Sequence, residues 1–257
     1  MRLSTKRGQR GSALDEFRHS GSLKCLYPRG NGPGLEAMLI NTAGGITGED
    51  AFALHAAAGA DTRLTLTTQA AERAYAVAGE NWGHLKTHLT VGPQARVDWL
   101  PQETILFEHC ALRRSLTVDL AENSTFLMVE PLIFGRIAMG EVLSEARFRD
   151  RTMIRRGGVP LFADQTDLRG DITGHLAKPQ IAKGAGAMAL VVYVGADAES
   201  FVDPLRRALP PTAGLSLIGP DVLTLRALAP DSNALRKSLV PMLERLNRHP
   251  LPRCWSL

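Results

Sequence analysis

The stretch H-L-K-T-H-L-T-V at residues 84–91 decides the fold class, because its side chains alternate in character. One set of alternate positions is Leu85, Thr87, Leu89 and Val91, and the other set is His84, Lys86, His88 and Thr90. A repeat of two residues is typical of a β-strand that buries one face and exposes the other. The pattern therefore predicts a half-buried strand that ends at Val91.

The same alternation recurs on both sides of this strand. Further strands are predicted at Ala37–Ile40, Arg63–Thr67, Arg96–Leu100, Leu116–Leu120, Thr125–Glu130, Ala189–Val194 and Val222–Leu228. Turn-forming pairs lie between the apolar segments, at residues 92–93, 122–123, 157–158 and 219–220. Short strands at a spacing of roughly 10 to 15 residues, with few helical patterns between them, indicate a mostly-β fold.

Two segments carry helical patterns instead. Residues 203–209 predict a short helix, with Asp203 as its N-cap and Pro204 at its first position. Residues 232–248 predict an amphipathic helix, which Pro241 should kink. We expect its leucines to pack on the sheet; the alternative is that this helix and the P-L-P-R-C-W segment after it form an exposed surface for a partner.

The formal net charge of +4 over 257 residues is a mild excess, and four basic residues lie near the start of the chain. Because glycines and polar residues surround them, residues 1–12 are expected to form a flexible basic arm. Residues 13–257 are expected to form a single β domain. The sequence shows no second basic cluster, so nucleic acid is not expected as a partner.

The apolar segments and the cysteines indicate the cell compartment. No apolar run approaches the roughly 20 residues that span a bilayer, and no apolar segment follows the N-terminal basic residues as in a secretory signal. The three cysteines, at positions 25, 110 and 254, are odd in number and widely spaced, which disfavours a disulfide framework. We therefore expect a cytoplasmic protein with no membrane association and no tightly bound cofactor.

The glycine-rich segment A-G-G-I-T-G at residues 43–48 has two interpretations. It resembles an incomplete dinucleotide-binding loop, which would make the protein a nucleotide-binding enzyme. That loop should open a helix, however, and residues 51–68 alternate like strands. The other interpretation is a tight turn that needs positive φ at Gly44, Gly45 or Gly48.

Candidate chemistry outside this turn is sparse. The chain has no nucleophile elbow, phosphate-binding loop or metalloprotease motif, so no catalytic residue is predicted. Glu108, His109 and Cys110 are consecutive metal-ligand types, but only two of them would share a strand face, so at most a transient nickel or zinc contact is expected. Glu130 lies between apolar segments and needs a partner, for which Arg136 is the candidate.

Several segments, taken in order, resemble the UreD family of urease accessory proteins, called UreH in some organisms. They include N-T-A-G-G-I-T-G-E-D at 41–50, T-T-Q-A-A-E-R at 67–73, W-L-P-Q-E-T-I-L-F at 99–107 and F-G-R-I-A-M-G-E at 134–141. The resemblance continues to the P-L-P-R-C-W segment and covers nearly the whole chain from about Leu23. One departure is Glu49, where the family's turn has a glycine, so a glycine-only backbone is not expected there.

The resemblance implies a β-helical scaffold with two helices that is not an enzyme. It implies a cytoplasmic maturation factor that binds UreF in a 2:2 core complex, recruits the GTPase UreG and docks on apo-urease for nickel insertion. It also implies that nickel passes transiently through an internal tunnel. Carried over to this sequence, the tunnel-lining candidates are Asp50, Thr67, Thr68, Gln69, Glu103, Glu130, Arg136 and Glu141.

Overall fold

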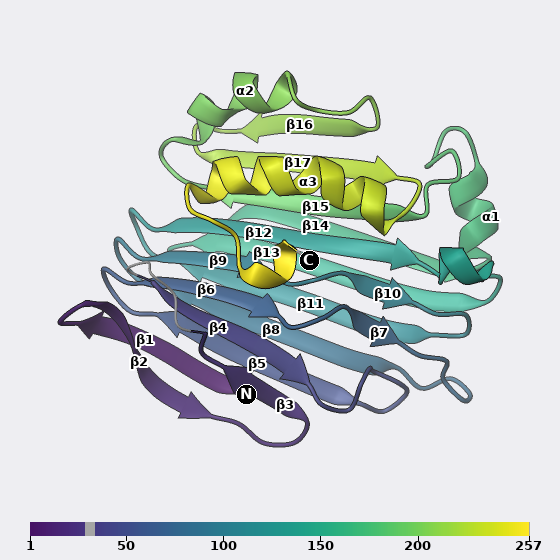
Figure 1. Cartoon of the computed structure of the whole chain (residues 1–257), viewed down its shortest axis with the longest axis horizontal. Coiled ribbons are helices and arrows are strands. Elements are labelled where there is room, and N and C mark those ends of the chain that lie inside the picture. The colour runs from purple at the N-terminus through teal and green to yellow at the C-terminus, as the bar shows by residue number, and fades with distance from the viewer. Residues whose placement is uncertain (29–33, 257) are drawn as a thin grey trace.

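The computed structural model describes residues 1–28 and 34–256. Across these residues a pair of β-sheets lies face to face, with the helix Ser232–Asn247 on one side and the short helix Ile172–Ala177 at one end (Figure 1). The seven-stranded sheet has the order β14-β13-β11-β8-β5-β1-β2. Its strands are β14 (Val159–Gly170), β13 (Ala146–Arg156), β11 (Ala111–Leu120), β8 (Gly83–Val91), β5 (Ala51–Ala58), β1 (Arg2–Gly8) and β2 (Gly11–Arg18).

The ten-stranded sheet follows the path β16-β17-β15-β12-β9-β6-β4-β3, and β10 joins it beside β12. Its strands are β16 (Ala213–Ile218), β17 (Val222–Ala229), β15 (Ala187–Val194), β12 (Thr125–Phe134), β9 (Arg96–Leu100), β6 (Arg63–Thr68), β4 (Leu35–Asn41), β3 (Leu23–Leu26), β10 (Thr104–Leu106) and β7 (Glu72–Ala74). The short helical elements are η1 (Ile137–Met139), η2 (Ala198–Phe201) and η3 (Arg253–Trp255).

The chain alternates between the two sheets from β4 to β13, so each turn adds a parallel strand to both. In the seven-stranded sheet β5, β8, β11 and β13 pair in parallel, and in the ten-stranded sheet β4, β6, β9 and β12 do the same. This winding is a β-solenoid-like arrangement. The expectation of a mostly-β, β-helical scaffold is confirmed.

Burial explains why alternating sequences form these strands. In β8, Thr87, Leu89 and Val91 face the space between the sheets and are buried. In β12 every residue from Phe126 to Phe134 is buried, because the seven-stranded sheet covers one face and a helix covers the other. The strands that are apolar throughout therefore lie in the middle of three layers.

The predicted long helix is α3 (Ser232–Asn247), which lies across the ten-stranded sheet (Figure 1). The carboxylate of Asp231 caps it by accepting the Ala234 N–H at 2.8 Å, and Pro241 lies inside it as expected. Its four leucines are buried on the sheet, and Trp255 in the following segment is buried as well. The expected packing on the sheet is confirmed, and the exposed-surface alternative is wrong for these leucines.

The other helices are short. The structure places α2 at Val202–Arg206, after η2, so Phe201 rather than Asp203 is the N-cap residue, and Asp203 and Pro204 lie inside the first turn. A third helix, α1 (Ile172–Ala177), was not predicted from the sequence. No helix of the described residues is both long enough and apolar enough to cross a membrane.

The expectation of a flexible arm at residues 1–12 is wrong. Strand β1 pairs with β2 and in parallel with β5, and the N-terminal amine donates to the Ala53 carbonyl at 2.6 Å. Leu3 is 1% exposed, and the Thr5 hydroxyl lies 2.7 Å from that of Thr62. The segment looked like a polar arm because its basic residues alternate with the few side chains that reach the core.

Candidate functional site

A cavity of about 220 Å³ lies between the two sheets. Strands β5, β8 and β11 line it from one side, and strands β4, β6, β9 and β12 line it from the other. Most of its wall is apolar, with leucines and Trp99, but polar and charged side chains also reach it. These are Asn41, Thr68, Gln69, Glu72, Arg73, Thr87, Gln102, Thr104, Arg114, Ser115 and Glu130.

Glu130 is the most deeply buried acid of this wall. The indole Nε1 of Trp99 donates to Glu130 Oε1 at 2.6 Å, and the guanidinium of Arg114 forms an ion pair with Glu130 Oε2. Arg114 also donates to Asp150 Oδ2 at 2.7 Å and to Thr104 Oγ1 at 3.1 Å. One guanidinium therefore connects two carboxylates at the edge of the cavity.

The partner predicted for Glu130 was wrong. Arg136 pairs instead with Glu141, at 2.8 Å, in the loop around η1. Arg136 lies six residues beyond Glu130 and past the end of β12, which corresponds to about 20 Å along an extended strand. Arg114 reaches Glu130 because it points inward from the opposite sheet.

Burial and charge act in opposite directions on this ion pair. Burial raises the pKa of the Glu130 carboxyl, and the adjacent Arg114 opposes the increase. Burial alone would lower the pKa of Arg114, but Asp150 and Glu130 outweigh that effect and raise it above its usual value. The guanidinium therefore stays charged inside the protein.

Glu72 is a second acid of the cavity wall, and it was not among the tunnel candidates. It begins β7, and both of its carboxylate oxygens accept hydrogen bonds from Asn41 Nδ2 at 3.2 Å. Burial raises the pKa of the Glu72 carboxyl, although the hydrogen bonds from Asn41 oppose the shift. The motif T-T-Q-A-A-E-R, which contains Glu72, was the signal that could have pointed to it.

The structure brings only some of the predicted set together. Thr68, Gln69 and Glu130 line the cavity, as does Gly44 of the turn. Thr67 lies on the opposite face of β6, because successive residues of a strand point to opposite faces. Its hydroxyl donates to the Leu100 carbonyl at 2.7 Å and lies 3.3 Å from Cys254 Sγ, beneath the C-terminal segment.

The remaining candidates also lie outside the cavity wall. Glu103 forms an ion pair with Arg236 of α3 at 3.0 Å. Asp50 accepts the backbone N–H of Thr47 at 2.9 Å and so closes the glycine turn. Arg136 and Glu141 pair with each other in the η1 loop, so these four residues make local contacts outside the cavity wall.

The glycine turn leads into strand β5 and not into a helix. Gly44 has φ of 81°, as a tight turn requires. A side chain at Gly45 or Gly48 would instead overlap Tyr75 or Val77, so these two glycines permit close packing. The turn therefore lacks the helix N-terminus that holds a pyrophosphate in dinucleotide-binding proteins.

The expectation for Glu49 was wrong. Its φ is 70°, which is the left-handed region that favours glycine. Its carboxylate accepts a hydrogen bond from Asn81 Nδ2 at 2.8 Å, an exposed contact that a glycine would not make. This position therefore has a backbone conformation that favours glycine, with a larger residue on it.

The consecutive ligand types at 108–110 do not form a set of three, although His109 Nε2 lies 3.9 Å from Glu108 Oε1. His109 has φ of 61°, Cys110 is 1% exposed, and Glu108 accepts the backbone N–H of Glu145. Burial raises the pKa of the Cys110 thiol to about 12. Across residues 1–28 and 34–256, no three His, Cys, Asp or Glu side chains are grouped closely enough to hold a metal ion.

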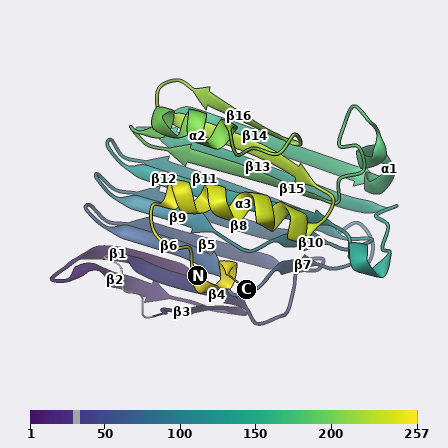
Figure 2. The same ribbon diagram turned by 45° about the horizontal axis from the view of Figure 1, so that its top comes forward.

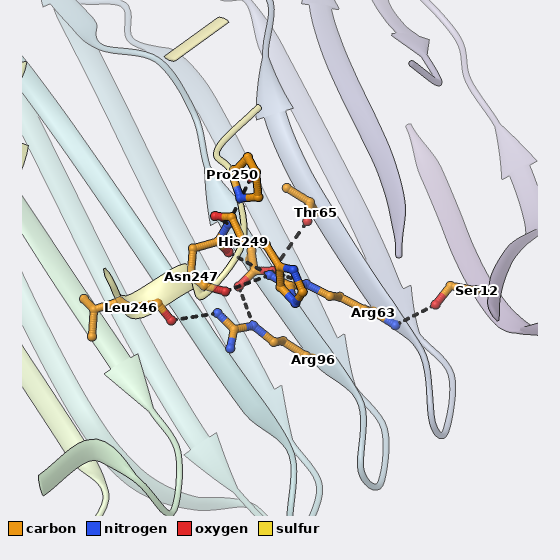
Figure 3. Close-up of polar contacts among 9 residues, drawn as sticks. Ser12, Arg63, Thr65, Arg96, Leu246, Asn247, His249 and Pro250 are labelled. Carbon is orange, nitrogen blue, oxygen red and sulfur yellow. Dashed lines mark hydrogen bonds and ion pairs between the residues drawn. The ribbon is translucent and has the colours of Figure 1, made fainter. Parts of the chain in front are cut away.

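A second buried polar cluster fixes the end of α3 (Figure 3). Asp98 is completely buried and accepts hydrogen bonds from Arg63 at 3.0 Å and from Arg96 at 2.8 Å. Arg63 also donates to Asn247 Oδ1 at 2.7 Å, and Arg96 donates to the Leu246 carbonyl at 3.1 Å. The two guanidiniums satisfy the last carbonyls of α3, where positive charge is favourable.

Comparison with known protein families shows to which family the chain belongs. A family model described as UreD urease accessory protein matches residues 1–256. The chain belongs to the UreD family. The urease accessory protein UreD of Ruegeria pomeroyi is 53% identical over 257 residues, covering 100% of both chains. UreD of Roseobacter denitrificans is 49% identical over 256 residues, covering 100% of this chain and 93% of its own.

The cavity gathers three of the segments that carry the resemblance to UreD. Asn41 and Gly44 come from the segment at 41–50, and Thr68, Gln69 and Glu72 come from the segment at 67–73. Trp99, Gln102 and Thr104 come from the segment at 99–107. In this UreD chain, motifs far apart in sequence therefore meet around one interior space.

Proposed function

We propose that this protein is a non-catalytic factor in urease maturation, which binds UreF, recruits the GTPase UreG and docks on apo-urease. The match to the UreD family over residues 1–256 carries this proposal. The family description names an accessory protein of urease, which agrees with a scaffold whose work is binding. The nucleotide-binding alternative is less well supported, because the glycine turn opens a strand.

We further propose that nickel, as cargo, passes through the cavity between the sheets. The carboxylates of Glu72 and Glu130 and the side-chain oxygens of Asn41, Thr68 and Gln69 offer hard ligands on its wall. Such oxygen ligands bind divalent nickel more weakly than imidazole or thiolate ligands do, and weak binding suits an ion that must move on. Arg114 forms an ion pair with Glu130 and partly neutralises its carboxylate, which weakens the attraction of that carboxylate for a passing cation.

Reconstituted activation tests the route. The variant Glu72→Gln/Glu130→Gln removes both acids of the wall at nearly unchanged volume, and it is mixed with apo-urease, UreF, UreG, GTP, nickel and bicarbonate. Urease activation should fall by about tenfold or more, which is the effect of removing even the groups that surround a metal ligand. Co-elution with UreF on a sizing column should persist.

The control is Asp50→Asn/Glu141→Gln, which removes two acids that lie outside the cavity wall. It should activate urease like the wild type. Equal activation by the cavity variant and the wild type would rule out the route. Failure of the wild-type chain to co-elute with UreF or apo-urease would contradict the scaffold role itself.

A further inference from the structure

The outer side of the seven-stranded sheet is an open, strongly basic surface. Helices α2 and α3 lie on the ten-stranded sheet, away from this surface (Figure 2). The outward side chains of β8, β11, β13 and β14 include seven cations and two acids, and we call this set the basic face. The cations are Lys86, Arg113, Arg147, Arg149, Arg151, Arg155 and Arg169, and the acids are Asp119 and Asp167.

The basic face holds the charge imbalance of the molecule. With the adjacent Glu80, which pairs with Arg147, the face has an excess of four positive charges. This excess equals the formal net charge of +4 for the whole chain, so the other residues of the chain together carry no net formal charge. Clustered charge of one sign creates a potential that attracts oppositely charged partners.

Three of these cations have no carboxylate partner among the residues that the structure describes. Lys86, Arg113 and Arg151 are exposed, and none of them forms an ion pair there. The strand register places Lys86 and Arg151 on either side of Ser115, and Arg113 lies two residues before Ser115. Three unpaired cations on neighbouring strands repel one another, and an incoming carboxylate would relieve that repulsion.

The details of the face favour a protein partner over a nucleic acid. Asp119, Asp167 and Glu80 are interspersed among the cations, and a continuous polyanion would be repelled by each of them. The guanidinium carbons of Arg113 and Arg147 lie 4.3 Å and 5.2 Å from the ring centroid of Trp82. Those guanidiniums occupy the ring on which a base would stack.

The size of the face suits a protein interface. Four strands about 4.8 Å apart and 9 to 12 residues long span roughly 670 Å², which is about four fifths of the area one partner contributes to a typical interface. The mixed charge pattern would set orientation as well as rate of association. We propose that the basic face docks an acidic protein surface of the urease maturation assembly; this inference rests on the proposed function.

The test uses two charge-reversed variants that alter net charge equally. Lys86→Glu/Arg151→Glu changes the basic face, and Arg10→Glu/Lys237→Glu changes exposed basic residues elsewhere. Each variant and the wild type are measured against immobilised apo-urease, UreF, UreG and a 20-base-pair DNA. The neutral variant Lys86→Gln/Arg151→Gln removes the positive charges without adding negative ones. A thermal melt of every variant shows whether it is folded.

The basic-face variant should bind at least one of the three proteins about tenfold or more weakly, mainly through a slower association rate. The neutral variant should show an intermediate loss, and the control pair should bind like the wild type. Raising NaCl from about 0.05 M to about 0.3 M should weaken the binding of the wild type and reduce the difference in affinity between the wild type and the basic-face variant.

Equal protein binding by all variants would overturn the docking surface and leave the proposed function standing. If the basic-face variant lost affinity for DNA but not for any of the three proteins, the proposed protein docking surface would be wrong, and the face would be a nucleic-acid binding surface. If the folded wild-type chain bound none of the three proteins, the proposed function would fail, and the docking surface would fail with it.

Discussion

Arg63 Nη2 donates a hydrogen bond to Asn247 Oδ1 at 2.7 Å and so joins strand β6 to the end of α3 across 184 residues of sequence. The same guanidinium pairs with Asp98, which is completely buried. Asp98 thus holds two arginines, and through them it holds the helix on the sheet. Because these contacts join the end of α3 to strands β6 and β9, the free energy that they contribute measures how strongly the helix is held on the sheet.

Replacing Asp98 with alanine should destabilise the protein by about 3–5 kcal/mol, because it leaves two partly buried guanidiniums without their carboxylate. Urea unfolding gives the free energy of unfolding for the variant and the wild type. The exposed Glu199 offers a control, since Glu199→Ala should change stability by less than about 0.5 kcal/mol. Similar stabilities for both variants would show that the cluster contributes little.

Replacing Arg114 with methionine should cost about 3–5 kcal/mol, because Glu130 and Asp150 would lose their shared cation. Combining Arg114→Met with Glu130→Gln should cost less than the sum of the two single changes, since no unpaired Glu130 charge then remains. A double-mutant cycle from urea unfolding measures the difference. Strict additivity would mean that the two side chains do not interact energetically.

Stability should depend on pH through Glu72. The pKa of the Glu72 carboxyl is higher in the folded state than in the unfolded state. The folded protein therefore binds more protons than the unfolded chain between these two pKa values, and it loses stability as pH rises through that range. Glu72→Gln does not titrate, so its free energy of unfolding relative to the wild type should increase between about pH 4 and about pH 7. Thermal melts across this range test the sign, with the exposed turn variant Glu122→Gln as the control. A constant difference across the range would contradict the raised pKa.

Two residues of the glycine turn should respond to substitution in opposite directions. Gly44→Ala should destabilise by about 1–2 kcal/mol, because φ is 81° there and an added Cβ meets no neighbouring atom that could explain the cost otherwise. Glu49→Gly should stabilise the protein by up to about 1 kcal/mol, because glycine adopts a positive φ without strain. The loss of the hydrogen bond from Asn81 reduces this gain. Thermal denaturation of both variants checks the two signs, and the same sign for both would contradict this account.

The sequence predicted those elements of the fold whose residues carry a local pattern. The strand at 85–91 and the helix at 232–248 both appear, because each pattern matches the burial of its own element. Strand β13 (A-R-F-R-D-R-T-M-I-R-R) was not predicted, because polar Asp150 and Thr152 hold inward positions and Met153 holds an outward one, which obscures the alternation. Strand β1 was predicted to be an arm because its basic residues alternate with the few side chains that reach the core.

The site was harder to predict, because its residues meet through tertiary contacts. The segments around the cavity are visible in the sequence, but adjacent residues such as Thr67 and Thr68 point to opposite faces of one strand. The partner of Glu130 comes from a different sheet, and the basic face gathers cations spread over residues 86–169. Neither the pairing nor the clustering can be read from local spacing.

The attachment of α3 to β6 and β9 has a consequence for synthesis. At about 5–20 residues per second, a ribosome needs roughly 10–40 s to add the 184 residues between Arg63 and Asn247. During that interval most strands of the ten-stranded sheet are made one after another, and α3 is not yet present to cover their apolar side. The nascent chain should therefore be most prone to aggregation just before residues 232–255 emerge, and a chaperone that binds apolar surface would act at that stage.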